Sequence, residues 1–242
     1  MQAIQLRPFG QPADLDLDFG QADRPALVTT LLAGCSAALD AAWWWGQPVG
    51  VRTAALLRLA VADAGAGEIG FSAQCAAAEC GEAFEFSLPL AALAGQAGQT
   101  LIPVALGPGR GLVLRRPTGA DLRTWRTRAP DAPQETVRAM LADLIVDGAA
   151  GPDDTDAVSR ALAEADPLVA FEVDAECPAC GAQNQVPIDL EDYALARLLR
   201  RRRALLREVH ELASHYGWSE RQILALTPAR RAEYLALVAE AR

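Results

Sequence analysis

The chain of 242 residues contains no lysine and only two histidines, so few of its side chains suit acid–base chemistry. All 22 basic residues are arginine, and because alanine is abundant, we attribute the absence of lysine to a GC-rich genome. His210 and His215 lie five positions apart, on different faces of a helix, which makes them poor joint metal ligands. The sequence also lacks an HExxH motif, a Ser–His–acid arrangement and a dinucleotide-binding loop. We therefore expect neither an enzyme nor a small-molecule substrate.

Long apolar runs are also missing. Apolar residues make up 51% of the chain, yet no uninterrupted run approaches the ~18–20 residues that cross a membrane. The first residues, Met-Gln-Ala-Ile-Gln-Leu-Arg, lack the apolar centre of a signal peptide. We expect a protein without a membrane-spanning segment that is cytoplasmic where it is made.

Four of the five cysteines form two close pairs with one downstream pattern. Each pair is followed by a glycine and then by apolar residues at every second position, which is typical of a half-buried strand. Four thiolates are the full ligand set of a closed tetrahedral zinc site. We predict one structural Zn²⁺ per chain, because such a site has no open position for substrate. The predicted ligands are Cys75, Cys80, Cys177 and Cys180.

Other interpretations of these cysteines remain open. A redox pair is expected to follow a strand and begin a helix, whereas both pairs here precede strand-like segments. Disulfides would require an oxidising compartment, which the N-terminal sequence does not suggest. Reduced, metal-free thiols are the main remaining alternative. Cys35 lies in an apolar helical stretch and is expected to be a small core residue.

The hydrophobic pattern predicts an α+β protein in three parts. Residues 1–67 form an N-terminal arm and helices, 68–190 a split zinc-ribbon-like β body, and 191–242 a helical C-terminal tail. A helical insertion at about 117–166, whose first helix Thr118 can cap, separates the two cysteine pairs. The alternation from Leu168 predicts a strand that leads into the second pair. Within the body, the glycine-rich stretch 107–111 lacks the Lys-Ser/Thr ending of a phosphate-binding loop and predicts a hairpin turn.

The N-terminal part begins with alternating polar and apolar residues at 14–19, which predict an arm or an edge strand that docks on a neighbour. Two helices are expected between Arg24 and Asp63, with a break near Gly46–Pro48. Three consecutive tryptophans precede this break. They cannot all face one core, so at least one ring is expected at the surface or at an interface; an alternative is a helix end tucked beneath the insertion.

The C-terminal tail predicts a long helix from Leu190 to Tyr216, because its leucines recur three or four positions apart. Leu206 is one residue of this expected buried stripe, and several arginines lie on the other faces. Gly217 is expected to end the helix, and two short capped helices follow. Residues 195–242 carry ten arginines against five glutamates, so this tail has a net charge of +5. Because the whole chain has a net charge of −9, residues 1–194 carry −14.

The segment from His210 to Tyr234 resembles the C-terminal signature of baseplate (hub or assembly) proteins of contractile-tailed phages and related contractile injection systems. The resemblance extends upstream to Arg116–Leu122, to Ala165–Pro167 and to both cysteine pairs, and it covers residues 68–242. The first pair departs from the usual pattern, because four residues instead of two separate its cysteines. The resemblance implies a non-enzymatic particle component with four cysteine ligands and a docking segment at 210–234. Such a component would be cytoplasmic during assembly, and a permanent one would stay in the mature virion or injection particle.

The expected partners are other baseplate or tail proteins. The arginine run at 200–203 could instead meet nucleic acid, as in a zinc-ribbon nucleic-acid-binding or regulatory adaptor, but the acidic remainder of the chain argues against this alternative. An enzyme with a catalytic metal is a second rival, and the closed ligand set argues against it. The residues predicted to contact partners are Trp43, Trp44, Trp45, Arg200, Arg201, Arg203, His210, Tyr216, Trp218, Arg230, Arg231 and Tyr234.

Overall fold

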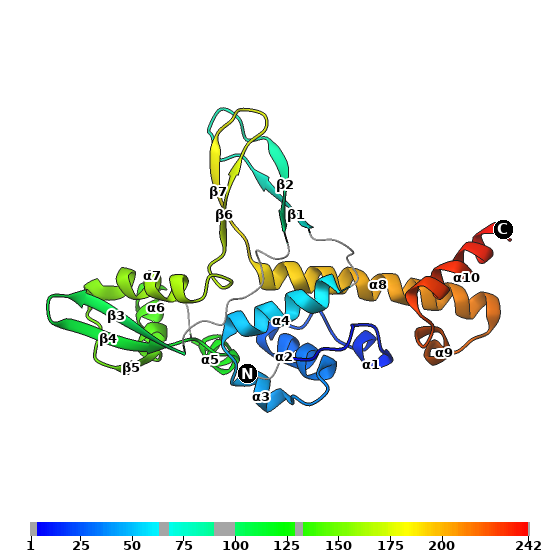
Figure 1. The fold of residues 1–242 in the computed structure, drawn as a ribbon, viewed down its shortest axis with the longest axis horizontal. Coiled ribbons are helices and arrows are strands. Elements are labelled where there is room, and N and C mark those ends of the chain that lie inside the picture. Colours follow the sequence, from blue (N-terminus) through cyan, green and yellow to red (C-terminus); the bar gives the residue numbers. More distant parts are fainter. Residues whose placement is uncertain (1–3, 63–67, 90–99, 129–132, 242) are drawn as a thin grey trace.

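The computed structural model describes residues 4–62, 68–89, 100–128 and 133–241. It is a mixture of helices and small antiparallel sheets, as the sequence predicts. Figure 1 shows a central helical body from which three parts project: an upright pair of β-hairpins, an insertion at one end and a helical tail at the other. No helix in the described part of the chain is long and apolar enough to span a membrane.

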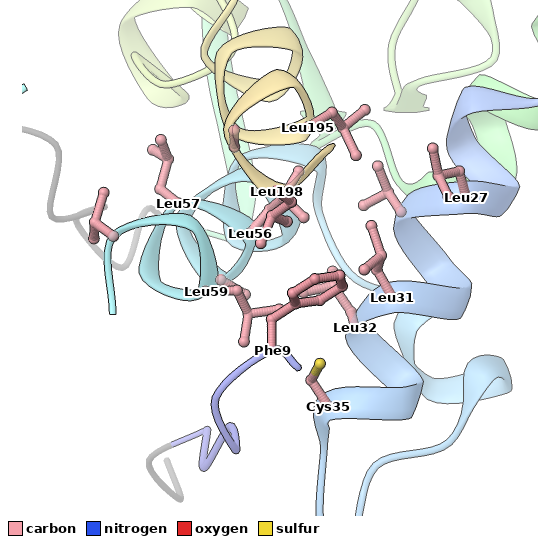
Figure 2. Close-up of a cluster of buried hydrophobic side chains, with 14 of the residues drawn as sticks. Phe9, Leu27, Leu31, Leu32, Cys35, Leu56, Leu57, Leu59, Leu195 and Leu198 are labelled. Carbon is pink, nitrogen blue, oxygen red and sulfur yellow. The ribbon is translucent and has the colours of Figure 1, made fainter. Parts of the chain in front are cut away.

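The central body is built from helices α2 (Arg24–Cys35) and α4 (Val49–Val61) and the first half of α8 (Leu190–Tyr216). The carboxylates of Asp23 and Asp189 cap α2 and α8 by accepting hydrogen bonds from backbone N–H groups of their first turns. The leucines of the three helices meet in one core, shown in Figure 2. Its side chains include Leu27, Leu31, Leu32, Cys35, Leu56, Leu57, Leu195 and Leu198.

The N-terminal segment is not an arm or an edge strand, so that prediction is wrong. It contains a short helix, α1 (Pro12–Leu15), and Phe9 and Leu15 are buried in the central core. The buried Asp14 carboxylate accepts hydrogen bonds from Arg7 at 2.7 Å and from the backbone N–H groups at the start of α1. Burial raises the pKa of Asp14, but these hydrogen bonds outweigh burial and leave the pKa below its ordinary range. This segment therefore packs on its own chain.

The stretch from Arg24 to Asp63 holds one more helix than the two expected. Asp40 accepts a hydrogen bond from Trp43 N at 2.8 Å and so begins the short helix α3 (Ala41–Trp45) between α2 and α4. Gly46 follows α3, in agreement with the predicted break. Cys35 is fully buried, which confirms its expected place in the core.

Two β-hairpins stand together and form what we call the arm (Figure 1). Strands β1 (Glu68–Gln74) and β2 (Ala83–Pro89) form one hairpin, and β6 (Glu172–Glu176) and β7 (Gln183–Pro187) form the other. The turns of both hairpins carry the cysteine pairs and lie at the far end of the arm. Because β6 begins at Glu172, the strand expected from Leu168 starts later than the alternation of residues suggested.

The insertion is a mixed α/β unit and not only helical, so its predicted boundaries were wrong. Strands β3 (Leu101–Gly107) and β4 (Arg110–Arg115), expected in the β body, pair instead with β5 (Ile145–Asp147). Helices α6 (Pro133–Ala142) and α7 (Thr155–Ala165) complete the unit, and α7 follows a 3-10 turn at Pro152–Asp154. Its own core contains Ile102, Val104, Leu112, Leu114, Leu144 and Val158.

The hairpin turn predicted at 107–111 is confirmed. β3 and β4 pair on either side of it, and Gly109 has a φ of +69°, a backbone conformation that favours glycine. No helix follows the turn directly, since β4 begins at Arg110.

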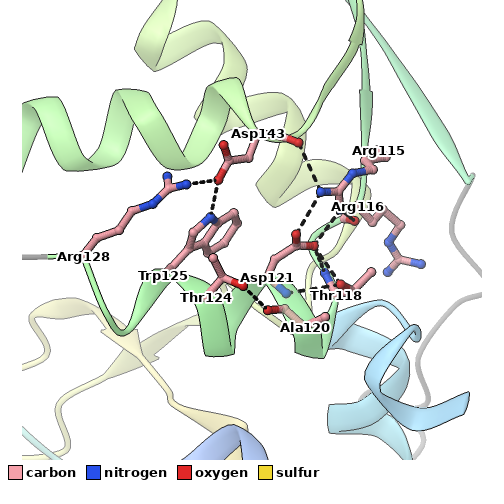
Figure 3. A network of polar contacts seen from close by, with 9 residues as sticks. All are labelled: Arg115, Arg116, Thr118, Ala120, Asp121, Thr124, Trp125, Arg128 and Asp143. Atoms are coloured by element: carbon pink, nitrogen blue, oxygen red, sulfur yellow. Dashed lines mark hydrogen bonds and ion pairs between the residues drawn. The ribbon is translucent and has the colours of Figure 1, made fainter. Parts of the chain in front are cut away.

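The predicted helix cap at Thr118 is also confirmed, at the start of α5 (Gly119–Trp125). The Thr118 hydroxyl and the Asp121 carboxylate form a capping box, and Arg115 binds that carboxylate at 2.6 and 2.8 Å. Burial raises the pKa of Asp121, but the hydrogen bonds from Arg115 and Thr118 leave it below its ordinary range. Figure 3 shows this network and its neighbour, in which Asp143 accepts from Trp125 and Arg128.

The insertion joins the central body at a neck closed by one buried ion pair. Arg116 leaves β4, Asp166 ends α7, and their side chains are 2.6 Å apart and each 5% exposed. Asp166 also accepts a hydrogen bond from Gly50 N at 3.1 Å, in the first turn of α4. A β-carbon at position 50 would collide with the Asp166 carboxylate, so any larger residue there would displace this partner of Arg116. The backbone N–H of Val49 donates to Pro117 O at 2.8 Å beside this pair.

The long helix α8 belongs to two cores. Up to Leu205 its buried residues face the central body, and from Leu212 onward they pack with α9 (Glu220–Leu224) and α10 (Pro228–Glu240) around Ile223 and Val238. Gly217, with a φ of +68°, ends α8 as expected. Leu206 is 37% exposed, whereas Leu205 is buried, so the predicted stripe is wrong at this point.

We expect Asp166→Asn to lower the free energy of unfolding by about 3–5 kcal/mol, because it leaves the Arg116 guanidinium buried without a counter-charge. Urea denaturation of the purified protein would measure the loss. Arg126→Gln is the matched control: it removes one partner of the more exposed pair with Asp23, and its cost should stay below about 1 kcal/mol. Equal losses in the two variants would show that the buried neck pair contributes no more to the free energy of unfolding than the exposed pair.

Candidate metal centre

The four predicted cysteine ligands meet at the tip of the arm. Their Sγ atoms all lie within 4.8 Å of one another. Two of these separations join different hairpins: Cys75 to Cys180 at 3.6 Å and Cys80 to Cys177 at 3.9 Å. A disulfide would bring two sulfurs to about 2.05 Å, so all four are free thiols.

The sulfur separations fit a tetrahedral metal ion. With a zinc–sulfur distance of about 2.3 Å, the edge of an ideal tetrahedron of sulfurs is about 3.8 Å. The recorded separations of 3.6 and 3.9 Å lie on either side of this value. Within the described ranges, no second group of three or more histidine, cysteine or acidic side chains has this geometry. The four cysteines are therefore positioned to bind one metal ion.

Both turns have the same hydrogen-bonded construction, despite their different lengths. The backbone N–H of Cys75 donates to Glu82 O and that of Cys177 donates to Ala182 O, each at 2.9 Å. The longer first turn is closed by a bond from Cys80 N to Ala77 O at 3.0 Å. Gly81 and Gly181 follow with φ values of +63° and +74°, which explains the glycine after each pair. The four-residue spacing thus still brings Cys80 to the cluster.

Asn184 connects the two turns, and the sequence analysis missed it. Its side-chain oxygen accepts a hydrogen bond from Ala76 N of the other hairpin at 2.7 Å, and its side-chain nitrogen donates to Ala182 O at 2.8 Å. The residue is 4% exposed. The available signal was its position: Asn184 pairs with the inward-facing Ala175, where the alternation calls for an apolar residue.

The protein environment separates the proton affinities of the thiols. Burial raises the pKa of Cys177, but backbone N–H donors of Ala179 and Cys180 and the neighbouring thiols lower it to about 7. At Cys180 a backbone N–H lowers the pKa, yet hydrogen bonds with the other thiols raise it to about 12. Of these two thiols, Cys177 is therefore the more readily deprotonated. Since the thiolate is the ligand form, metal binding at the cluster releases protons.

A metal ion at this position would link two segments about a hundred residues apart in the sequence. The apolar core under the turns is small, with Phe84 and Ala175 buried and Phe86 and Val186 partly buried. Such a core supplies little stability, and a metal adds folding free energy where ligands converge. Four sulfur ligands leave a tetrahedral ion no open position. The arrangement fits a structural metal centre.

The tryptophan run is mostly used inside the chain. Trp44 is fully buried, so its prediction as a partner contact is wrong; its indole N–H donates to Ser36 Oγ at 3.1 Å. Trp43 packs edge-on against it and is partly exposed. Trp45 is also partly exposed, and the guanidinium groups of Arg52 and Arg123 lie over its ring, at 5.3 and 5.0 Å from the ring centroid.

The arginines predicted to contact partners differ in exposure. Arg200 and Arg203 are exposed, whereas Arg201 is only partly so. Arg231 is 4% exposed and pairs with Glu208 at 2.7 Å, and it also donates to Leu226 O. The prediction of Arg231 as a partner contact is therefore wrong, because it holds α10 against α8.

The remaining predicted residues gather at the C-terminal end. Tyr216, Trp218 and Tyr234 pack on one another with ring centroids 4.6–5.6 Å apart, and each is partly exposed. The exposed Arg230 lies over the Tyr234 ring at 5.7 Å. His210 is exposed on α8. Tyr216, Trp218 and Tyr234 thus form one aromatic cluster, with Arg230 against it.

No family model, curated protein or solved structure matches the chain.

We expect Asn184→Ala to lower metal affinity by about 10–100-fold, because it removes the bonds that hold the two turns in register while leaving all four ligands in place. Competition with a chromophoric chelator would measure the change. Gln185→Ala, an exposed neighbour on the same strand, should bind metal like the wild type. An unchanged affinity in Asn184→Ala would show that the cysteines alone position the site.

Proposed function

We propose that this chain is a non-enzymatic structural subunit or assembly adaptor in the baseplate of a contractile phage tail or related injection system, stabilised by one Zn²⁺. The observation that carries the proposal is the closed four-cysteine cluster, which fits a structural ion and leaves no position for a substrate. The resemblance of the 210–234 segment to baseplate proteins is the reason for proposing a baseplate as the assembly.

Zinc is the metal that suits this donor set. Thiolates are soft ligands, and a closed tetrahedral group of four sulfurs is typical of structural zinc or of iron–sulfur centres. One ion bound between two cysteine-bearing hairpin turns is the arrangement of a zinc ribbon. In this proposal the ribbon is split, because the insertion lies between its two hairpins in the sequence.

A hollow of about 710 Å³ at the base of the arm also favours a non-enzymatic role. Four of the five charged residues that line it are held in ion pairs: Arg24 pairs with Asp189 at 2.6 Å and Glu191 at 2.8 Å, and Arg126 pairs with Asp23 at 3.0 Å. Burial raises the pKa of Glu191, and its arginine neighbours lower that pKa by less than burial raises it. Groups held in mutual pairs are not free to bind and activate a substrate.

The shape of the chain supports a role among several neighbours. Its accessible surface is 14074 Å², whereas a compact monomer of 25.7 kDa is expected to expose about 10,400 Å². The arm, the insertion and the tail project from the central body (Figure 1). Such projections offer separate surfaces to different partners. In this proposal the protein acts in the cytoplasm during assembly, and a permanent subunit would remain in the particle.

A second candidate is a zinc-ribbon adaptor that binds nucleic acid. The exposed arginines of α8 favour it, since guanidinium groups bind phosphates. The arm argues against it, because its two hairpins contain acidic residues and no arginine. Salt-dependent binding of DNA that disappears in Arg200→Gln/Arg203→Gln would support this candidate over the baseplate role.

We expect one zinc per chain in the purified protein and none in Cys177→Ser, which should also unfold at a lower denaturant concentration. Metal analysis by mass spectrometry and urea denaturation would measure both. Cys35→Ser is the control, because it alters a buried cysteine outside the cluster and should keep the zinc. Iron in place of zinc would correct the metal, and full zinc in Cys177→Ser would contradict the site.

Removal of residues 208–242 should prevent assembly of tails without releasing the metal. The cut spares Leu205 and the earlier core residues of α8, but it removes the whole C-terminal aromatic cluster. The truncated gene would replace the original in the genome that encodes it, and electron microscopy would count complete tails. Metal content of the purified truncated protein is the control for folding. Normal tails would rule out docking through this segment.

A further inference from the structure

One face of α8 carries three arginines that are available for an intermolecular contact. Arg200, Arg203 and Arg207 are exposed and follow the spacing i, i+3, i+7, which places them on one side of the helix. We call them the arginine stripe. No ion pair joins any of the three to another residue in the described ranges. Neighbouring arginines differ: Arg197 donates to Ala60 O and Arg202 to Leu15 O, at 2.8 and 2.7 Å, so they serve the body of the chain itself.

The arm carries the opposite charge on an exposed strand face. Glu172, Asp174 and Glu176 occupy alternate positions of β6, so their side chains lie on one face, and all three are exposed. We call them the acidic row. The residues opposite them on β7 are Pro187, Gln185 and Gln183, which add no positive charge. Residues 68–89 and 172–187 together contain seven acidic residues and no arginine.

The two charged sets match in number and length. The acidic row extends over four residue steps of a strand, or about 13 Å at about 3.3 Å per residue. The arginine stripe extends over seven steps of a helix, or about 10.5 Å at about 1.5 Å per residue. Three carboxylates can therefore lie beside three guanidinium groups along one line. Arginine suits this contact because its planar group binds carboxylates through two hydrogen bonds.

The two sets do not meet within one chain. Figure 1 shows the arm projecting away from α8, which leaves the arm's tip far from the helix. No ion pair joins the described residues of the arm to the arginine stripe. We propose that the acidic row of one copy binds the arginine stripe of a second copy of this chain.

This contact uses two different surfaces, one from each copy. A bound pair therefore leaves one acidic row and one arginine stripe unfilled, and further copies can add until a ring closes or a filament extends. The inference goes beyond the baseplate role and needs no tail protein. Failure of self-association would leave that role standing, and loss of the baseplate role would leave this contact standing.

Sedimentation velocity of the purified, zinc-loaded protein would test the proposal at several concentrations and two salt levels. We expect oligomers at 0.05 M salt that dissociate near 1 M, where the Debye length falls to about 3 Å. Arg200→Glu/Arg203→Glu/Arg207→Glu should weaken association at low salt by at least about tenfold, since it replaces three attractions by repulsions. Glu172→Arg/Asp174→Arg/Glu176→Arg should weaken it equally.

An equimolar mixture of the two reversed variants gives the sharpest result. The stripe variant presents two acidic surfaces and the row variant presents two basic ones, so either variant alone should stay monomeric. In the mixture, each acidic surface can bind a basic surface of the other variant, and alternating oligomers should form. The matched control is Arg138→Glu/Arg160→Glu/Arg221→Glu, which makes the same change in net charge at exposed arginines elsewhere and should associate like the wild type. Circular dichroism would verify the fold of each variant.

Three results would overturn the proposal. The wild type could remain monomeric at low salt, the mixture of reversed variants could fail to associate, or the control could lose association as fully as the stripe variant. Binding of a DNA duplex by a monomeric wild type, lost in the stripe variant, would assign the arginine stripe to nucleic acid instead.

Discussion

The buried pair of Arg116 and Asp166 determines how the parts of this chain are placed. It joins the two points at which the insertion enters and leaves, and Asp166 also binds the first turn of α4. Two charges removed from water are stable only if each is the partner of the other and the remaining hydrogen bonds are made. The segment between these two residues has its own core, and α5 adds further attachments to the body, such as the ion pair of Arg126 with Asp23.

The candidate metal centre and the neck each bring together residues that are far apart in the sequence. Both close a long excursion of the chain: the neck brings together residues 116 and 166, and the cysteines bring together residues 75 and 177. The second closure encloses the first in the sequence. A metal ion at the cysteines would fix the outer one, where the hairpins bury little apolar surface, whereas the neck is held by a desolvated ion pair within a packed junction.

Features that depend on local sequence were predictable. The cysteine pairs, the helix cap at Thr118, the hairpin at 107–111 and the end of α8 at Gly217 follow from a few neighbouring residues each. The predictions for Leu206 and Trp44 were wrong for a different reason: α8 passes from one core to another, and α3 turns one tryptophan inward. Asn184 was missed because its partner, Ala76, lies in the other half of the chain. In the sequence this contact shows only as a polar residue where the alternation calls for an apolar one, which does not identify the partner.

Helix α8 has a mechanical consequence. It is one uninterrupted helix of 27 residues, about 40 Å long, and β7 of the arm ends just before its first turn. Its first half is clamped in the central body and its far end lies in the C-terminal cluster. A force applied at that cluster would therefore be transmitted along this helix to the base of the arm. The protein can transmit a displacement between its ends without a hinge in this helix.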